Sequence, residues 1–452
     1  MSYYNFHKLN SLEIYLSLLF KQIFIWNVWL TLVPIEYFSN MVKLNLLRVY
    51  FEVSRLIGLC NLHYDSRTQR FRLYHVPTLV YCSILDIAYI LILPFALILL
   101  TGNLYKCPQI GMFRAVYNVV GLSKFLTMLL LICNVWIQRR RLHQIGNDFM
   151  EMLHKFRFAL HKDCRKKCLW KVFLTGSRFI IFTQQLVFRD SLVRCENDFK
   201  LRKAMLPYNV AAIFYSWIMI LMVSYVDLTI YIIQVAGNWF VVNMSQSVQE
   251  MIQDLEALPK RNGIPREMGL RQISSAWRKL WRQCLQLDKV LKQTVNIFEW
   301  QLLLNLLTTY IFNIATLFRL WIYLEFDKNF QIGKGIFFAV LFLVYHVEIL
   351  MQFFIFEINR TKWLEVRNLV VKLSYANISG NNHKYSQGII LSRQLEFSLW
   401  YLNRRLQPNP QRVRRLHILG LFDLNNATVH KMTRSVLTNV LVLCQIAYKI
   451  YG

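Results

Sequence analysis

The chain has 452 residues, of which 55% are hydrophobic and only 17% are charged. Soluble proteins carry about 25% charged residues, so these charges are too few to cover two or three soluble domains. The aromatic content of 15% excludes a disordered chain, and nine Cys in this length exclude a disulfide scaffold. The composition therefore predicts an all-α polytopic membrane protein.

Seven mostly apolar runs approach the length of roughly 20 residues that a helix needs to cross a bilayer. In chain order they are Val76–Thr101, Arg114–Gln138, Leu169–Val187, Tyr208–Val235, Trp300–Leu324, Gly335–Ile358 and Ser435–Tyr451. The third run contains Lys171 and Arg178, and the seventh is short. The connection between the fifth and the sixth is so short that these two helices are expected to form a hairpin.

The distribution of cations predicts the orientation. The net charge of +28 comes from 53 Lys and Arg against 25 Asp and Glu. With a cytoplasmic N-terminus, 39 of the cations fall on the cytoplasmic side and nine on the external side. Cytoplasmic loops of membrane proteins carry such an excess. We therefore predict a cytoplasmic N-terminus, an external C-terminus and no binding of nucleic acid, for which no reader motif is present.

Residues 9–38, ahead of the first span, are also apolar and aromatic. They fit an additional span, a signal anchor or an amphipathic helix that lies on the membrane. A further interpretation is that Met41 is the biological start, which leaves 412 residues.

Two polar stretches on the predicted cytoplasmic side have apolar residues at helical spacing. One is Ala236–Glu299, which Pro259–Gly263 divides into two helices, and the other precedes the seventh span. We expect helices that continue inward from the spans and pack as a cytoplasmic bundle. These helices can pack against one another within one chain or take part in contacts between subunits, and the sequence does not decide between the two.

The sequence has no phosphate-binding Gly loop, no zinc-protease motif and no nucleophile elbow, so we expect no enzyme activity and no cofactor. His161, Cys164 and Cys168 have a spacing like that of metal ligands. A fourth ligand is missing and the segment is basic, so no metal site is expected.

Ionisable residues inside spans are costly and need a structural or functional reason. Asp86 and Lys124 are at similar depth and are expected to form a structural pair. For Arg319, His346 and Glu348, pairing between helices and a polar ligand cavity are both open.

The seventh span has one polar face. Thr438, Val442, Gln445 and Lys449 follow the spacing i, i+4, i+7 and i+11 and therefore share a side of the helix. A wet polar face suits a channel wall, which dewetting at Val442 or Ile446 would close. A seam between helices of one bundle is the alternative.

The C-terminal sequence resembles that of insect gustatory receptors, chemosensory channels related to insect odorant receptors. Gly420–Asn425 reads Gly-Leu-Phe-Asp-Leu-Asn, and the seventh span has Thr438, Asn439, five apolar residues, Gln445 and Ile446. In that family the last span has Thr-Tyr, five apolar residues and Gln-Phe. Thr438 and Gln445 match, whereas Asn439 replaces the Tyr and Ile446 replaces the Phe. The departure at Asn439 puts the local packing in doubt.

The resemblance implies a ligand-gated, non-selective cation channel of the plasma membrane, opened by an external tastant. Four identical or related subunits, embedded in lipid, would surround a pore lined by the seventh span. Gln445 would face the pore near the gate, with Thr438 and Val442 on the same side, and Ile446 would take the place of the gating aromatic residue. The implied organisation is a cytoplasmic segment at 1–75 with residues 1–40 as a possible leader, spans one to six with the ligand pocket at 76–358, a cytoplasmic helical region at 359–434 and the pore helix at 435–452.

Polar and aromatic side chains in spans two to six are the candidates for the ligand pocket. They are Tyr117, Gln184, Tyr215, Trp217, Arg319, Trp321, Tyr345 and His346. An odorant receptor shares this plan and is an alternative. A metabotropic seven-helix receptor needs the opposite orientation, and a membrane enzyme with His346 as base lacks a catalytic partner on the same helix face.

Overall fold

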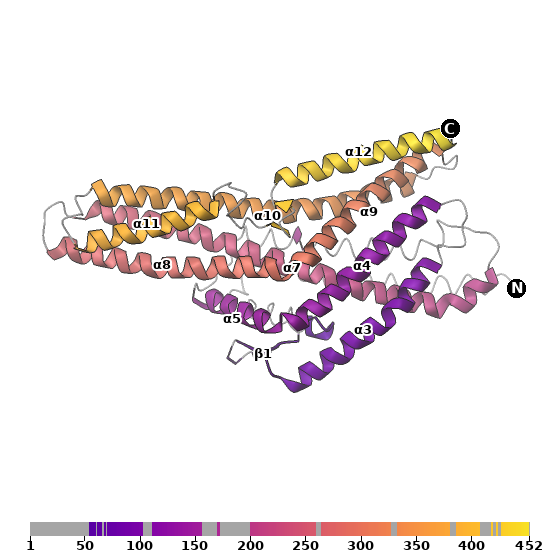
Figure 1. Cartoon of the computed structure of the whole chain (residues 1–452), viewed down its shortest axis with the longest axis horizontal. Coiled ribbons are helices and arrows are strands. Elements are labelled where there is room, and N and C mark those ends of the chain that lie inside the picture. Colours follow the sequence, from indigo (N-terminus) through magenta and orange to yellow (C-terminus); the bar gives the residue numbers. More distant parts are fainter. Residues whose placement is uncertain are drawn as a thin grey trace.

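The computed structural model describes residues 54–59, 61–65, 67–68, 70–102, 111–155, 170–171, 199–258, 264–326, 332–379, 386–406, 417–418, 422–423 and 426–451. Within this part of the chain the fold consists of long helices and two small hairpins (Figure 1). The helices are α3 (Val76–Gly102), α4 (Gly111–Ile137), α5 (Arg139–Lys155), α7 (Phe199–Ala257), α8 (Ile264–Ile297), α9 (Glu299–Phe326), α10 (Ile332–Ser379), α11 (Ser386–Leu406) and α12 (Asn426–Tyr451). The antiparallel hairpins are β1 (His63–Asp65) with β2 (Arg70–Arg72), and β3 (His417–Ile418) with β4 (Phe422–Asp423).

Five of the described helices, α3, α4, α7, α9 and α10, contain a stretch that is long and apolar enough to cross a membrane. They confirm the first, second, fourth, fifth and sixth predicted spans. Residues 172–187 of the third predicted span, as well as residues 9–38 and Met41, lie outside the described residues. The seventh span lies within α12, which begins at Asn426 rather than at Ser435 and is not one of the five.

Two helices extend far beyond their membrane stretch. Helix α7 has 59 residues and α10 has 48, and the two pack against each other. Figure 1 shows α8 and α11 packed beside them at one end, and α3, α4, α9 and α12 at the other. The predicted helical extensions are therefore present and pack within one chain. The predicted boundaries at 358/359 and 434/435 fall inside the unbroken helices α10 and α12.

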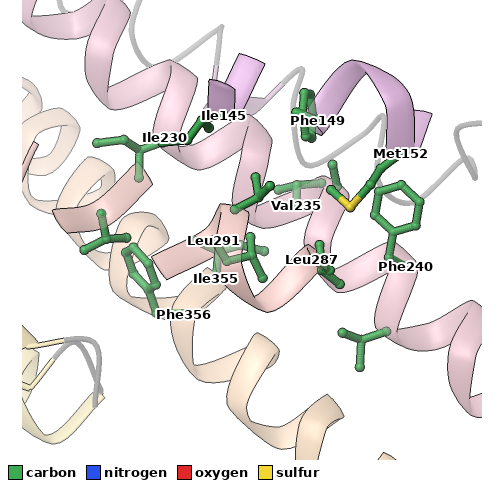
Figure 2. Packing of buried hydrophobic residues seen from close by; sticks show 14 of the residues in the cluster. Ile145, Phe149, Met152, Ile230, Val235, Phe240, Leu287, Leu291, Ile355 and Phe356 are labelled. Carbon is green, nitrogen blue, oxygen red and sulfur yellow. The ribbon is translucent and has the colours of Figure 1, made fainter. Parts of the chain in front are cut away.

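The main hydrophobic core lies where α5, α7, α8 and α10 meet, as Figure 2 shows. Ile230, Val235 and Phe240 of α7 belong to this core together with Leu287 and Leu291 of α8. Burying a side chain of this size stabilises the fold by about 1.5–3 kcal/mol. The helices approach closely at Gly237, where an added Cβ would lie 2.7 Å from a methyl group of Leu291.

The hairpin of β1 and β2 packs against α5 just before the first span. The backbone N–H of Phe71 donates to Asn147, at 2.8 Å, and the Phe71 ring lies against Gly146. Across the two strands Arg72 donates to Asp65. The backbone N–H of Arg67 and the Arg72 guanidinium hold the pKa of the Asp65 carboxyl at about 2.

Candidate functional site

Helix α12 has one packed face and one exposed face. Val429 and Val436, with exposed fractions of 5% and 1%, are buried on the side of α9 and α10. The predicted pore residues are all exposed, and Val442 and Ile446 have exposed fractions of 46% and 48%. These residues are Thr438, Val442, Gln445 and Ile446. The helix therefore presents the predicted face outward, away from its own subunit, and the role of this face in a pore remains a prediction.

Beside its packed face, α12 is attached to α9 by three side chains, which we call the polar triangle: Tyr310, Ser435 and the exposed Asn439. The Asn439 amide donates to the Tyr310 hydroxyl at 2.8 Å and to the Ser435 carbonyl at 2.9 Å. The hydroxyl oxygens of Tyr310 and Ser435 are 2.7 Å apart. Asn439, which replaces the family's Tyr, is thus accommodated by a tyrosine on α9.

A second contact attaches α12 to α10. Nε2 of His346 lies 3.3 Å from the Thr433 hydroxyl, which itself donates to the carbonyl of Val429 at 2.9 Å. Because the Thr433 proton is already used, His346 acts as the donor in this contact. His346 also stacks on Phe342 of its own helix. Its contact with Thr433 shows that the ring is directed to the α12 side of the bundle.

The predicted ligand residues do not form a single group. Gln184 lies outside the described residues, and Tyr117 is on α4 without a described side chain. Arg319 lies over the Phe338 ring, 4.9 Å from its centroid. Phe338 shares a small hydrophobic cluster of α4, α9 and α10 with Tyr345. Arg319 therefore borders this cluster through Phe338, and Tyr345 is one of its members.

The remaining candidates have other neighbours. The Tyr215 hydroxyl donates to the carbonyl of Tyr89 at 2.8 Å, which joins α7 to α3. Trp321 stacks on Phe318 of its own helix, and Trp217 is half-buried on α7. With His346 directed to α12, the list separates into three regions of the bundle.

Two ionisable side chains inside the bundle form a buried ion pair. Lys171, at the start of the predicted third span, lies 3.2 Å from Glu348 of α10, and their side-chain exposed fractions are 1% and 7%. The Lys171 nitrogen also lies 5.7 Å from the centroid of the Tyr231 ring on α7. For Glu348 the sequence left open pairing between helices or a polar ligand cavity. In the structure Glu348 pairs between helices.

The expected pair of Asp86 and Lys124 has different partners. The Trp136 indole donates to Asp86 at 2.7 Å, and the Lys124 nitrogen lies 5.8 Å from the centroid of the Phe312 ring. The expectation used only the depth of the two residues in the membrane. Which partner each one meets also depends on the direction in which its side chain points from its helix. Asp86 of α3 therefore ties the first two spans together.

A small polar hollow lies between α4, α7 and α9, next to Asp227, which accepts a hydrogen bond from Asn305. Its accessible volume of about 10 Å³ admits about one water molecule. It is lined by Lys124, Thr127, Met219, Ile220, Val223, Asn305 and Thr308. None of these residues is among the predicted ligand residues. Thr127, Asn305 and Thr308 are uncharged, so the search for charges in spans did not find them.

Comparisons with known proteins give a consistent result. The family model described as 7tm chemosensory receptor matches residues 47–450. The chain is 67% identical over 407 residues to gustatory receptor 58c of Drosophila melanogaster, which covers 90% of this chain and 99% of that protein. Its fold is similar to that of the olfactory receptor OR5 from Machilis hrabei in complex with eugenol. That likeness has a TM-score of 0.52 at 14% identity and covers 89% of this chain and all of the other.

Proposed function

Because the chain belongs to the 7tm chemosensory receptor family, we propose that it is a gustatory-type receptor that opens a cation-conducting pore when an external small molecule binds. Family membership and the five apolar helices make it a multi-pass protein of the plasma membrane. The family is one of receptors and not an enzyme class. The relative's name, gustatory receptor, supports a tastant as the external ligand.

The observation that carries the pore proposal is the two-sided character of α12. Its inward side packs against α9 and α10, whereas Thr438, Gln445 and Lys449 are exposed on the opposite side. The Thr438 hydroxyl already donates to the carbonyl of Arg434 at 2.9 Å, but an amide such as that of Gln445 costs several kcal/mol when it faces lipid without a hydrogen bond. A water-filled pore between subunits removes this cost.

The gate in this proposal is formed by apolar residues next to the polar ones. Val442 and Ile446 are half-exposed on the outward side of α12, on either side of Gln445 in the sequence. Four copies of these side chains around an axis would form an apolar constriction that excludes water and therefore ions. Gln445 would supply a ring of amides that contacts the ions once water enters.

Assembly into a homo- or heterotetramer is supported by α11. Its outer side exposes Ile389, Ile390, Phe397 and Trp400, and the last two rings stack with centroids 5.9 Å apart. We propose that this helix is cytoplasmic, where such a patch of exposed apolar residues marks a contact with another protein chain. In the proposed tetramer this aromatic stripe meets neighbouring subunits.

The proposed orientation agrees with the burial of two glycosylation sequons on the side that we propose is cytoplasmic. Asn359 is buried and its amide donates to Gln234 at 2.7 Å. Asn377 is also buried and donates to the carbonyl of Gly388 at 3.2 Å. Neither side chain is accessible to a sugar, as expected for residues that remain in the cytosol.

Ligand binding is proposed at the outer ends of α9 and α10, near Arg319 and Tyr345. Arg319 provides a cation and Tyr345 an aromatic ring within one small cluster with Phe338. Convergent polar and aromatic groups of this kind are typical of small-molecule sites.

Currents from cells that express the chain, recorded with a tastant panel, test the proposal. We expect Gln445→Ala to change the relative permeability of Na⁺, K⁺ and Ca²⁺ and to leave ligand potency nearly intact. Arg319→Ala should shift ligand potency without changing permeability. The reverse pattern, in which Arg319→Ala alters permeability and Gln445→Ala does not, would refute α12 as the pore wall.

A further inference from the structure

The polar triangle lies at the middle of α12, where it determines how the helix is rotated against α9. Figure 1 shows α12 lying alongside α9. Asn439 precedes Val442 by one helical turn and Ile446 by two, so the three residues lie near one side of the helix. A rotation that moved Val442 and Ile446 would move Asn439 as well.

The hydrogen bonds of the triangle form a closed set. The Asn439 amide uses its two hydrogens for the Tyr310 hydroxyl and the Ser435 carbonyl. Because the Tyr310 oxygen accepts from Asn439, its own proton is available for the Ser435 hydroxyl, 2.7 Å away. Tyr310 is thus both acceptor and donor toward α12, and no single member can leave without breaking the set.

We propose that the polar triangle of Tyr310, Ser435 and Asn439 is a latch that holds the pore helix α12 in its closed position, and that opening requires the latch to break. This inference rests on the proposed function, since it takes α12 as the pore wall. We take the described conformation, in which the side chains of Val442 and Ile446 are exposed on α12, as the closed one. The triangle is formed in this same conformation and therefore favours the closed state.

The expected magnitude follows from hydrogen bonds between helices inside membranes. Losing one such bond shifts an equilibrium by about threefold on average. If four subunits open together, the effects multiply to roughly 80-fold in the opening equilibrium. Removal of the Tyr310 oxygen breaks two bonds of the triangle and is therefore expected to raise the resting current by at least this factor, without a change in the residues that contact ions.

The experiment measures the ligand-free current of the full-length receptor in cells, carried by Na⁺ and normalised to surface protein. Tyr310→Phe, which keeps the ring, is expected to raise this resting current, and so is Ser435→Ala. The double variant should raise it by less than the product of the two single effects, because both changes remove the same hydrogen bond. The control is Thr309→Val on the same helix, whose hydroxyl donates to the carbonyl of Asn305, and it should leave the current unchanged.

Two results would overturn the latch. One is an unchanged resting current in Tyr310→Phe and Ser435→Ala receptors that reach the surface normally. The other is a decreased current, which would assign the triangle to the open state.

Permeability ratios from the same cells separate this proposal from the proposal that α12 lines the pore. A broken latch changes how often the pore opens and leaves its selectivity as it was. Failure of Gln445→Ala to change selectivity counts against the pore wall, whereas the resting current of Tyr310→Phe decides the latch.

Discussion

Replacing Glu348 with Gln is expected to destabilise the receptor strongly, because it removes the carboxylate that pairs with the Lys171 charge inside the helix bundle. The two side chains are 3.2 Å apart, and their exposed fractions of 7% and 1% leave them almost no access to water. The pair joins the predicted third span to α10, and the Tyr231 ring of α7 covers the Lys171 nitrogen. Three helices therefore depend on one charge interaction.

The magnitude depends on what remains after the substitution. Breaking a buried ion pair by removing one partner costs about 3–5 kcal/mol, because the other charge stays desolvated. The free energy of unfolding of a protein is typically about 5–15 kcal/mol, so this loss is a large fraction of it. Replacing both partners removes both charges, and such double replacements are often neutral or stabilising by about 1–4 kcal/mol. Lys171→Met combined with Glu348→Gln should therefore recover most of the stability.

The assay is thermal inactivation of the purified receptor in detergent, together with the surface level in cells. Each single variant should be less stable than the double variant. The controls are Lys362→Met and Glu365→Gln on α10, which break an exposed pair 2.8 Å long that is worth about 0–1 kcal/mol. A double variant as unstable as the two single variants would show that packing around these side chains, and not their charges, stabilises the bundle.

Two further predictions concern the assembled channel. Helix α12 has no Asp or Glu, and Lys449 is exposed near its C-terminal end. Lys449→Glu should therefore raise the permeability of Ca²⁺ relative to Na⁺, and Lys449→Gln should give an intermediate permeability ratio. Reversal potentials measure this order, and an unchanged ratio across the series would place Lys449 away from the ion path. Replacing both Phe397 and Trp400 with Ser should dissociate the tetramer in detergent, whereas Tyr375→Ser, which removes an exposed aromatic residue of α10, should not. Mass measurements of the solubilised receptor distinguish a tetramer from dissociated subunits. A tetramer that stays intact when Phe397 and Trp400 are both Ser would contradict the proposed contact.

The spans were predictable because a membrane helix must satisfy its backbone internally and present apolar side chains over a fixed length. The five apolar helices therefore coincide with runs visible in the sequence. The extensions of α7 and α10 beyond their membrane stretch were also visible, since their apolar residues continue at helical spacing. The start of α12 at Asn426 was not, because Lys431 and Arg434 occupy its first turns and hide the helix from a search for apolar runs.

The positions of the candidate ligand residues were predictable only as a depth in the membrane. A residue's position along a span gives its depth, but its facing depends on how each helix is rotated against several neighbours. Tyr215 and Tyr345 were both expected in one pocket, yet Tyr215 bonds to the carbonyl of Tyr89 on α3 and Tyr345 packs against Phe312 on α9. The partner of Asp86 was missed for the same reason.

The helix that we assign to the pore is the predicted span that is not among the five apolar helices of the described chain, and the assignment accounts for this. A helix surrounded by lipid must be apolar on all sides, whereas a helix between a bundle and water needs only one apolar side. Val429 and Val436 form that side on α12, and the polar triangle adds hydrogen bonds to α9 beside it. The same polarity that weakens α12 as an isolated span makes its position depend on contacts with α9 and α10. A pore helix held by a few polar contacts can be released by a change in the helices that hold it, which links a ligand near the outer ends of α9 and α10 to the gate.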